Sequence, residues 1–201
     1  MVNSEQRRPD VRRRPSGRTS AVRERTLAAT VDLVAQYGIA GVRYEEIAER
    51  AGVHRASVYR NWPVLDELIN EALIHFAQQE VPIEDSGDLR NDLVQLLTRL
   101  AAALSAPTGR AILNALQAAG DGSAVRKTVH AYVDQRVSLL KQRIERAVDQ
   151  GELPPVDAYF VAELLSGPVH LYVSRGIRPF GREEAEKLTD VVLAGIRATT
   201  P

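Results

Sequence analysis

The sequence predicts an all-α protein of nine helices, divided into a small N-terminal bundle and a larger C-terminal one. Three observations support this prediction. Apolar residues recur three and four positions apart from residue 19 almost to the end of the chain, which is the spacing of amphipathic helices. The alternation of β-branched and polar residues that indicates strands does not occur. Stretches dense in Gly and Pro separate the periodic segments and provide the breaks between helices.

The N-terminal part begins with an unusual tail. Residues 1–18 are rich in Arg, Pro, Ser and Gly and lack apolar periodicity, so we predict a disordered basic tail. Four helices are expected before a break at residues 81–88, which is rich in acidic residues and contains Pro and Gly. The four helices form the first predicted domain, residues 19–80, and they are expected at residues 19–37, 44–51, 54–61 and 65–79.

Five further helices form the second predicted domain, residues 84–201. The segments between them, SAPT, AGDGS, GELPP and GIRPFG, contain the Gly and Pro residues that end helices. No segment repeats another, so the sequence favours a single larger bundle over an array of repeated units. The expected helices span residues 89–105, 109–118, 124–150, 157–175 and 182–199.

Charge is unevenly distributed along the chain, although the formal net charge is zero. Residues 1–62 contain 12 Arg and 7 acidic residues, whereas residues 63–201 contain 14 Arg and Lys and 19 acidic residues. Such an asymmetry indicates that the N-terminal part binds a polyanion. The alternative is a loose basic tail without a specific partner.

Composition excludes several classes of protein. The chain has no Cys, which excludes disulfides, thiolate zinc sites and a Cys nucleophile. No apolar run approaches the 18 residues of a membrane span, and no apolar stretch follows the basic N-terminus as in a secretory signal. We therefore expect a cytoplasmic protein that does not contact membranes. No metal or cofactor is expected, because none of the His residues has metal-ligand spacing; they are His54, His75, His130 and His170.

Residues 44–62, YEEIAERAGVHRASVYRNW, have the spacing of a helix-turn-helix. Ala48 lets the second helix cross closely, Gly52 suits the positive φ of a tight turn, and Val58 can fill the angle between the helices. A short second helix of this kind enters the major groove of DNA. A helical hairpin with a solvated polar face is the alternative. The expected DNA contacts are Arg43, Tyr44, His54, Arg55, Ala56, Ser57, Tyr59, Arg60 and Asn61.

Residues 37–73, YGIAGVRYEEIAERAGVHRASVYRNWPVLDELINEAL, resemble the TetR (tetracycline-repressor) family of bacterial transcriptional regulators. The C-terminal part shares only the helical rhythm of that family. The chain has Arg43 where the family commonly has Thr, His54 where it has Ser, and Val64-Leu65 where it has Ser-Lys. The last difference removes a phosphate-binding Lys. The resemblance is carried by Ile47-Ala48, Ala51-Gly52-Val53, Ser57-Val58-Tyr59, Trp62-Pro63 and Glu67-Leu68.

The resemblance implies a repressor that binds a palindromic double-stranded DNA operator as a homodimer and is released by a small molecule in its C-terminal domain. A dimer also follows from the residues, because one helix-turn-helix offers few contacts for specific binding. The last two helices are the predicted dimer interface, since Gly167 and Gly195 allow close approach beside long apolar stripes. The stripes are Phe160, Leu164 and Leu171 on one helix, and Leu188, Val191, Val192 and Ile196 on the other.

The small-molecule effector is expected to be apolar or aromatic, because the C-terminal helices are rich in apolar residues and contain few polar anchors. The alternative function is a helical small-molecule-binding protein or an enzyme with an incidental helix-turn-helix-like hairpin. We expect no enzyme, since the sequence contains no coherent set of nucleophile, base and metal ligands. The candidate ligand contacts are Phe76, Asn114, Gln117, Tyr132, Gln135 and Tyr172.

Overall fold

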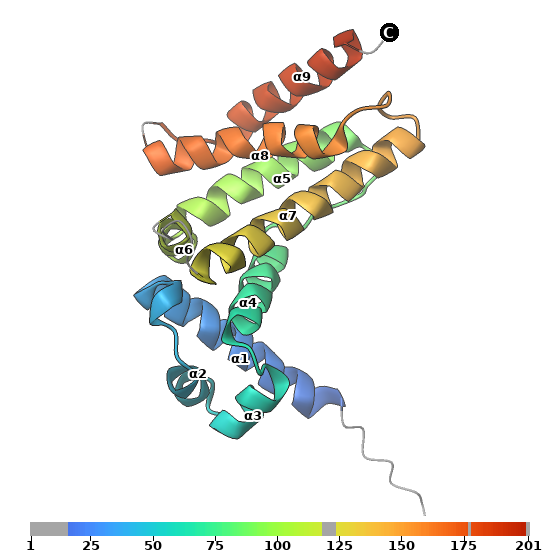
Figure 1. The fold of residues 1–201 in the computed structure, drawn as a ribbon. Coiled ribbons are helices and arrows are strands. Elements are labelled where there is room, and N and C mark those ends of the chain that lie inside the picture. Colours follow the sequence, from blue (N-terminus) through green and yellow to red (C-terminus); the bar gives the residue numbers. More distant parts are fainter. Residues whose placement is uncertain (1–15, 118–123, 177, 200–201) are drawn as a thin grey trace, which may run out of the picture.

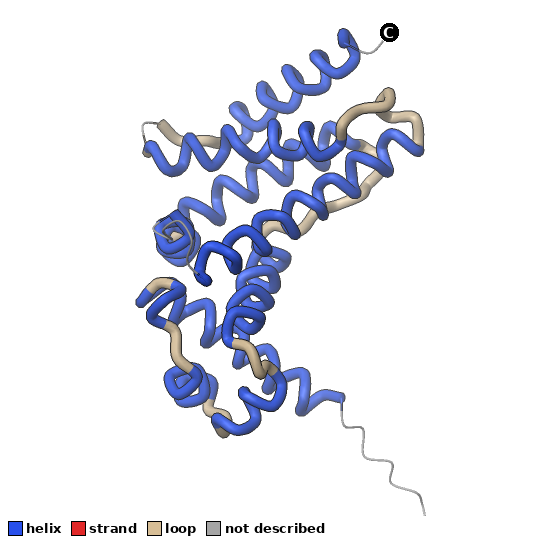
Figure 2. The backbone as a smooth tube through the Cα atoms, in the orientation of Figure 1, coloured by secondary structure: helices blue, strands red, loops and turns tan. Residues whose placement is uncertain are grey.

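The computed structural model describes residues 16–117, 124–176 and 178–199 (Figure 1). These residues form α-helices joined by short connections, with one 3-10 turn and no strand (Figure 2). The all-α prediction is confirmed. The elements are α1 (Ser16–Tyr37), η1 (Ile39–Gly41), α2 (Tyr44–Ala51), α3 (Arg55–Asn61), α4 (Leu65–Glu80), α5 (Leu89–Ser105), α6 (Pro107–Gln117), α7 (Ala124–Asp149), α8 (Ala158–Arg175) and α9 (Arg182–Thr199).

Four helix starts differ from the prediction, those of α3 and α8 by one residue and those of α1 and α6 by more. The two larger differences have identifiable reasons. α1 begins at Ser16, so residues 16–18 are helical and not part of a disordered tail, whereas residues 1–15 lie outside the described residues. The first fully buried apolar side chain described in α1 is Leu27, so apolar spacing could not report the first turns. α6 begins with Pro107, because the fixed φ and missing N–H of Pro suit the first position of a helix.

The buried apolar side chains form two clusters. The first lies among α1, α2, α3 and α4 and includes Leu27, Ile47 and Leu68. The second lies among α5, α7, α8 and α9. Ile112 of α6 belongs to the first cluster although it follows the break at residues 81–88, and α4 packs on both α1 and α7. The two parts are therefore in direct contact, with α6 and α7 lying against the N-terminal helices (Figure 1).

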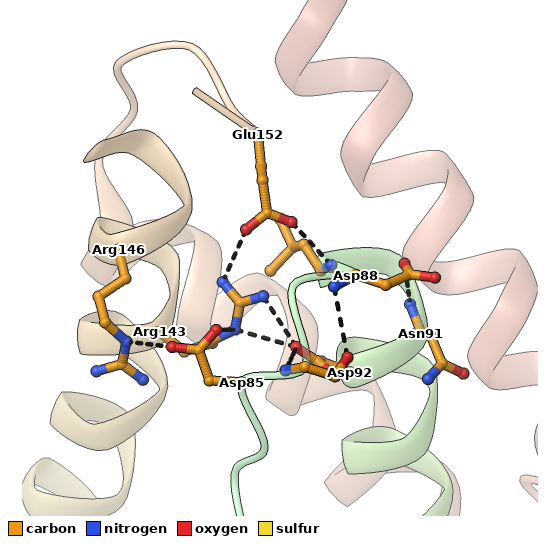
Figure 3. A network of polar contacts seen from close by, with 9 residues as sticks. Asp85, Asp88, Asn91, Asp92, Arg143, Arg146 and Glu152 are labelled. Atoms are coloured by element: carbon orange, nitrogen blue, oxygen red, sulfur yellow. Dashed lines mark hydrogen bonds and ion pairs between the residues drawn. The ribbon is translucent and has the colours of Figure 1, made fainter. Parts of the chain in front are cut away.

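A buried ion network holds the connection between α4 and α5 in place (Figure 3). Arg143 of α7 has only 1% of its side chain exposed, and its Nη2 lies 2.9 Å from Oδ2 of Asp92 in α5. The same guanidinium lies 3.2 Å from Asp85 in the connection and 3.3 Å from Glu152 after α7. Asp92 also accepts hydrogen bonds from the hydroxyl and the amide of Ser86. The segment predicted only as a break is thus fixed to two helices.

None of the helices in the described part of the chain is long and apolar enough to cross a membrane.

The buried network should contribute measurably to stability. Replacing Asp92 by Asn leaves the Arg143 guanidinium without its most buried partner, so we expect the free energy of unfolding to fall by about 3 kcal/mol. The measurement is urea unfolding at one fixed protein concentration. Arg90→Gln is the matched control, because Arg90 pairs with Asp190 at the exposed surface and its loss should leave the urea midpoint unchanged.

The difference in the free energy of unfolding between wild type and Asp92→Asn should depend on pH in a defined direction. Burial opposes ionisation of Asp92, but hydrogen bonds from Ser86 and Arg143 outweigh it and keep the pKa of Asp92 below its ordinary value. Its contribution to stability is therefore complete above the unfolded pKa of about 3.9 and is lost as the pH falls through the lower folded pKa. The gap between wild type and Asp92→Asn should close in that range; a constant gap down to pH 2 would contradict this assignment.

Candidate nucleic-acid interface and ligand cavity

α2 and α3 form a helix-turn-helix around a left-handed glycine. Gly52 has φ 63° and ψ 44°, a conformation that costs other residues about 1–2 kcal/mol. The amide of Val53 then donates to the carbonyl of Ala48 at 3.0 Å, which closes the turn. Val58 of α3 is buried in the same cluster as Ile47 of α2. The predicted turn and the predicted filling of the interhelix angle are both confirmed.

The C-terminal end of α3 is held by two aromatic residues. Tyr44, at the start of α2, donates its hydroxyl to the carbonyl of Trp62 at 2.8 Å, and its ring packs edge-on against Tyr59 with centroids 5.6 Å apart. Trp62 is buried and donates its indole N–H to Glu71 of α4 at 2.7 Å. Glu71 also pairs with Arg23 of α1. α3 is therefore fixed to α2 and α4, and through Glu71 indirectly to α1, although it buries little of its own surface.

The remaining surface of α3 faces solvent. Tyr59 has 55% of its area exposed, and Arg60 and His54 make no side-chain hydrogen bond or ion pair with any described residue. Arg55 pairs with Glu45 of α2 at 2.6 Å, and Asn61 donates to the carbonyl of Ser57. Of the other residues expected to contact DNA, Ala56 and Arg43 are exposed, Ser57 and Tyr44 are half-buried, and Arg43 donates to the carbonyls of Ala40 and Val42.

A cavity of about 280 Å³ lies in the C-terminal bundle, among α5, α6, α7 and α8 and the C-terminal end of α4. Most of its lining is apolar, and the described residues that line it include no Asp or Glu. The polar lining side chains are Gln117, Tyr132, Arg136, Ser166 and His170.

Two of the six candidate ligand contacts, Gln117 and Tyr132, line this cavity. The other four do not. Phe76 lines a separate cleft of about 300 Å³ between α1 and α4, and Asn114 and Gln135 are exposed. Tyr172 lies near the end of α8, where its ring packs edge-on against that of Phe180. The sequence does not show which way such residues point. A polar residue beside an apolar stripe can face either the interior or the solvent, depending on its position around the helix.

Sequence reasoning missed Arg136, although a signal was available. Arg136 follows Tyr132 by four residues, so the two side chains share one face of α7. Its Nη2 donates to the carbonyl of Val81 at 3.0 Å. Burial lowers the pKa of Arg136 and raises the pKa of Tyr132. Both nevertheless keep their protons at neutral pH, so both remain hydrogen-bond donors facing the cavity.

The outer face of α8 and α9 exposes large apolar side chains. Phe160 is 59% and Val191 70% exposed, and a Cβ added to Gly167 or Gly195 would meet nothing within 4 Å. The predicted stripe on α9 needs correction, however. Val192 and Ile196 are buried in the C-terminal cluster and Leu188 packs against it, because they belong to the inward phase of the helix. The exposed apolar residues are Phe160, Leu164, Leu171 and Val191.

Among the described residues, no group of three or more acidic or His side chains is placed to hold a metal ion.

Both parts of the chain match known protein families. Residues 27–72 match the bacterial regulatory proteins of the tetR family. Residues 83–192, more than half of the chain, match the tetracyclin repressor-like C-terminal domain. The chain belongs to the TetR family. It is therefore a helix-turn-helix transcriptional regulator, and its two matched regions correspond to the helix-turn-helix and to the bundle that contains the cavity.

Individual TetR-type relatives cover most of the chain. The HTH-type transcriptional regulator AqdR of Rhodococcus erythropolis is 32% identical over 158 residues, which cover 78% of this chain and 76% of AqdR. The HTH-type regulator YdeS of Bacillus subtilis is 28% identical over 148 residues, 71% of this chain and 73% of YdeS. The crystal structure of the TetR family regulator SCO0332 has a TM-score of 0.70 and 25% identity, and covers 87% of this chain and 98% of that one.

In this TetR-family helix-turn-helix, the Tyr44 hydroxyl should stabilise the position of α3. Tyr44→Phe removes its hydrogen bond to the Trp62 carbonyl, so we expect the free energy of unfolding to fall by about 0.5–1.5 kcal/mol. Fluorescence of Trp62, the single Trp of the chain, reports unfolding directly. Tyr37→Phe is the control, because the exposed Tyr37 makes no side-chain hydrogen bond with described residues; equal losses in both variants would refute the role of Tyr44.

Proposed function

We propose that this TetR-family regulator is a cytoplasmic repressor that binds a palindromic double-stranded DNA operator as a homodimer. In this proposal, a small molecule in the cavity releases it from the DNA. The observation that supports the proposal most strongly is the state of α3, whose two ends are held while its donor side chains remain exposed. A helix of this kind is ready to bind DNA without first being ordered.

α3 has the size and the chemistry of a recognition helix. Its seven residues span about 10 Å, which fits the width of the major groove. Its exposed Arg and Tyr side chains donate to phosphate oxygens and to base edges. The proposed DNA-contacting surface consists of Arg43, Tyr44, His54, Arg55, Ala56, Ser57, Tyr59, Arg60 and Asn61.

The outer face of α8 and α9 supports the proposed homodimer. It exposes Phe160, Leu164, Leu171 and Val191 near two glycines that leave room for another helix. Large apolar side chains on one continuous face are typical of an interaction site. A second copy would cover this face in a two-fold arrangement, and the two α3 helices would then read two half-sites.

The cavity supports binding of a small molecule, and we assign it no catalytic role. Its apolar lining with a few polar groups is typical of ligand sites. Ser166 and His170 both line it, but Ser166 donates its hydroxyl to the carbonyl of Ala162 at 2.9 Å. It therefore lacks the hydrogen bond to a base that activates a nucleophile. A ligand releases DNA if it binds the DNA-free conformation more tightly.

Replacing Arg55 or Tyr59 by Ala should weaken specific DNA binding. If each contacts a base edge, the loss is about 1–3 kcal/mol, or roughly 5- to 150-fold in affinity. The measurement is fluorescence anisotropy with an operator selected from random DNA by the purified protein. Arg50→Ala is the control: Arg50 lies on α2 and donates to Gln36 of α1, away from the recognition helix. Unchanged affinity in both α3 variants would refute the recognition-helix assignment.

The exposed face of α8 and α9 should govern self-association. Equilibrium sedimentation at micromolar protein should give about twice the chain mass of 22.1 kDa. Phe160→Glu combined with Val191→Glu should give a monomer, because two buried charges would oppose association. Val64→Glu places a charge on an exposed apolar residue elsewhere and should remain dimeric. A dimeric double variant would locate the interface on another face.

A further inference from the structure

Among the described residues, the cavity lining contains a cationic side chain and no acidic one to balance its charge. α7 places Arg136 and Tyr132 on the same wall, and the guanidinium of Arg136 donates to the carbonyl of Val81. It makes no ion pair with any described residue, and none of the described residues that line the cavity is an Asp or Glu. The contrast with Arg143 on the same helix is clear, because that guanidinium faces three carboxylates.

A half-buried guanidinium in apolar surroundings is energetically costly. Burial lowers the pKa of Arg136, but a guanidinium stays protonated in proteins, so the charge cannot be relieved by loss of a proton. The guanidinium has five N–H donors, and only one hydrogen bond joins them to a described residue. An anionic partner within the cavity would offset the desolvation of the charge and fill the remaining donors.

We infer that the effector is an amphipathic anion: an acid group that pairs with Arg136 and accepts from the Tyr132 hydroxyl, on an apolar body that fills the rest of the cavity. This inference rests on the proposed ligand-binding function of the cavity and names the chemical class of its ligand. It adds an acid group to the apolar or aromatic effector that the sequence predicts, because Arg136 lies on the cavity wall.

The geometry limits the size of such a molecule. The walls that would contact the body are aliphatic side chains of α5 and α7, such as Leu97, Leu100 and Leu140. The volume of about 280 Å³ lies just below the range of roughly 300–1,000 Å³ for ordinary ligand pockets. A medium-chain alkanoic acid and an aromatic acid of one or two rings share the required chemistry.

The contact between Arg136 and Val81 connects this anion site to α4. Val81 is the residue at the C-terminal end of α4, and its own amide donates to Ala77 in the last turn. An acid group in the cavity would bind the same guanidinium that donates to the Val81 carbonyl. Tyr132, which shares the site, also packs against the N-terminal cluster. Anion binding therefore acts on two contacts that hold the N-terminal helices against α7.

The test compares two fluorescent probes that differ mainly in charge, 1-anilinonaphthalene-8-sulfonate and the neutral N-phenyl-1-naphthylamine. Both are titrated into the full-length wild type, Arg136→Gln, Arg136→Lys and the control Lys141→Gln. Lys141 lies on α7 outside the cavity and pairs with Glu145, so its variant removes the same charge from the same helix. Circular dichroism checks that every variant is folded.

The wild type and Lys141→Gln should bind the sulfonate at least about tenfold more tightly than the neutral probe, as expected for hydrogen bonds to a charged group. Arg136→Gln should lose this preference and still bind the neutral probe, and Arg136→Lys should recover part of it. Equal affinity for both probes in the wild type, or an unchanged preference in Arg136→Gln, would overturn the inference. A folded Arg136→Gln that binds neither probe would also overturn it, since Arg136 would then maintain the cavity itself.

Two further measurements complete the test. One identifies which type of acid binds, and the other separates this inference from the proposed function. Decanoic acid and 2-naphthoic acid, each beside its carboxamide, compete with the bound sulfonate; displacement by an acid but not by its amide supports the anion site and shows which body fits. Displacement by the amides alone would overturn it. Operator binding is measured separately: loss of the sulfonate preference with intact DNA binding refutes only the ligand class, whereas absent DNA binding refutes the proposed repressor.

Discussion

The packing of α4 against two different helices is the constraint on which the rest of the structure depends. On one side α4 contributes Leu68, Leu73 and their neighbours to the cluster shared with α1, and on the other it packs on α7. Through Glu71 it also accepts the Trp62 hydrogen bond that holds the end of α3. A displacement of α4 therefore cannot leave both its contacts with α3 and those with α7 unchanged, because well-packed interfaces deform little without rearranging.

The features that sequence could predict are those determined within a few residues. Gly52 indicates a positive φ, because few other residues adopt that conformation. Val58 lies at the spacing from Ala48 that is typical of a helix-turn-helix. The helical periods and their Gly- and Pro-rich breaks likewise depend on local chemistry. The starts of α1 and α6 differ from the prediction by three and two residues, since the first turn of a helix contributes little to the core and leaves no apolar period.

The features that sequence could not predict depend on distant partners or on the phase of a helix. Arg143 and Asp92 are separated by 51 positions, and nothing near either residue indicates that they meet in the interior. Val191 and Val192 look equivalent in the sequence, yet one faces solvent and the other lies in the core. The same ambiguity placed Gln135 among the ligand candidates in place of its neighbour Arg136. Only the packing of α7 against α4 and α8 decides between them.

The anchoring of residues 85–92 by Arg143 has a mechanical consequence. This segment is fixed to α5 and α7. The connection that follows Val81 can therefore change its conformation little when α4 moves. In the proposed switch, α4 would act as a lever that tilts about its end near Val81 and moves the end that packs on α1 beside α3. Its 16 residues give an arm of about 24 Å, so a tilt of about 5° moves the far end by about 2 Å, on the scale of known helix shifts. In the proposed two-fold dimer both copies of α4 would tilt. The distance between the two α3 helices would then change by more than the shift of either helix.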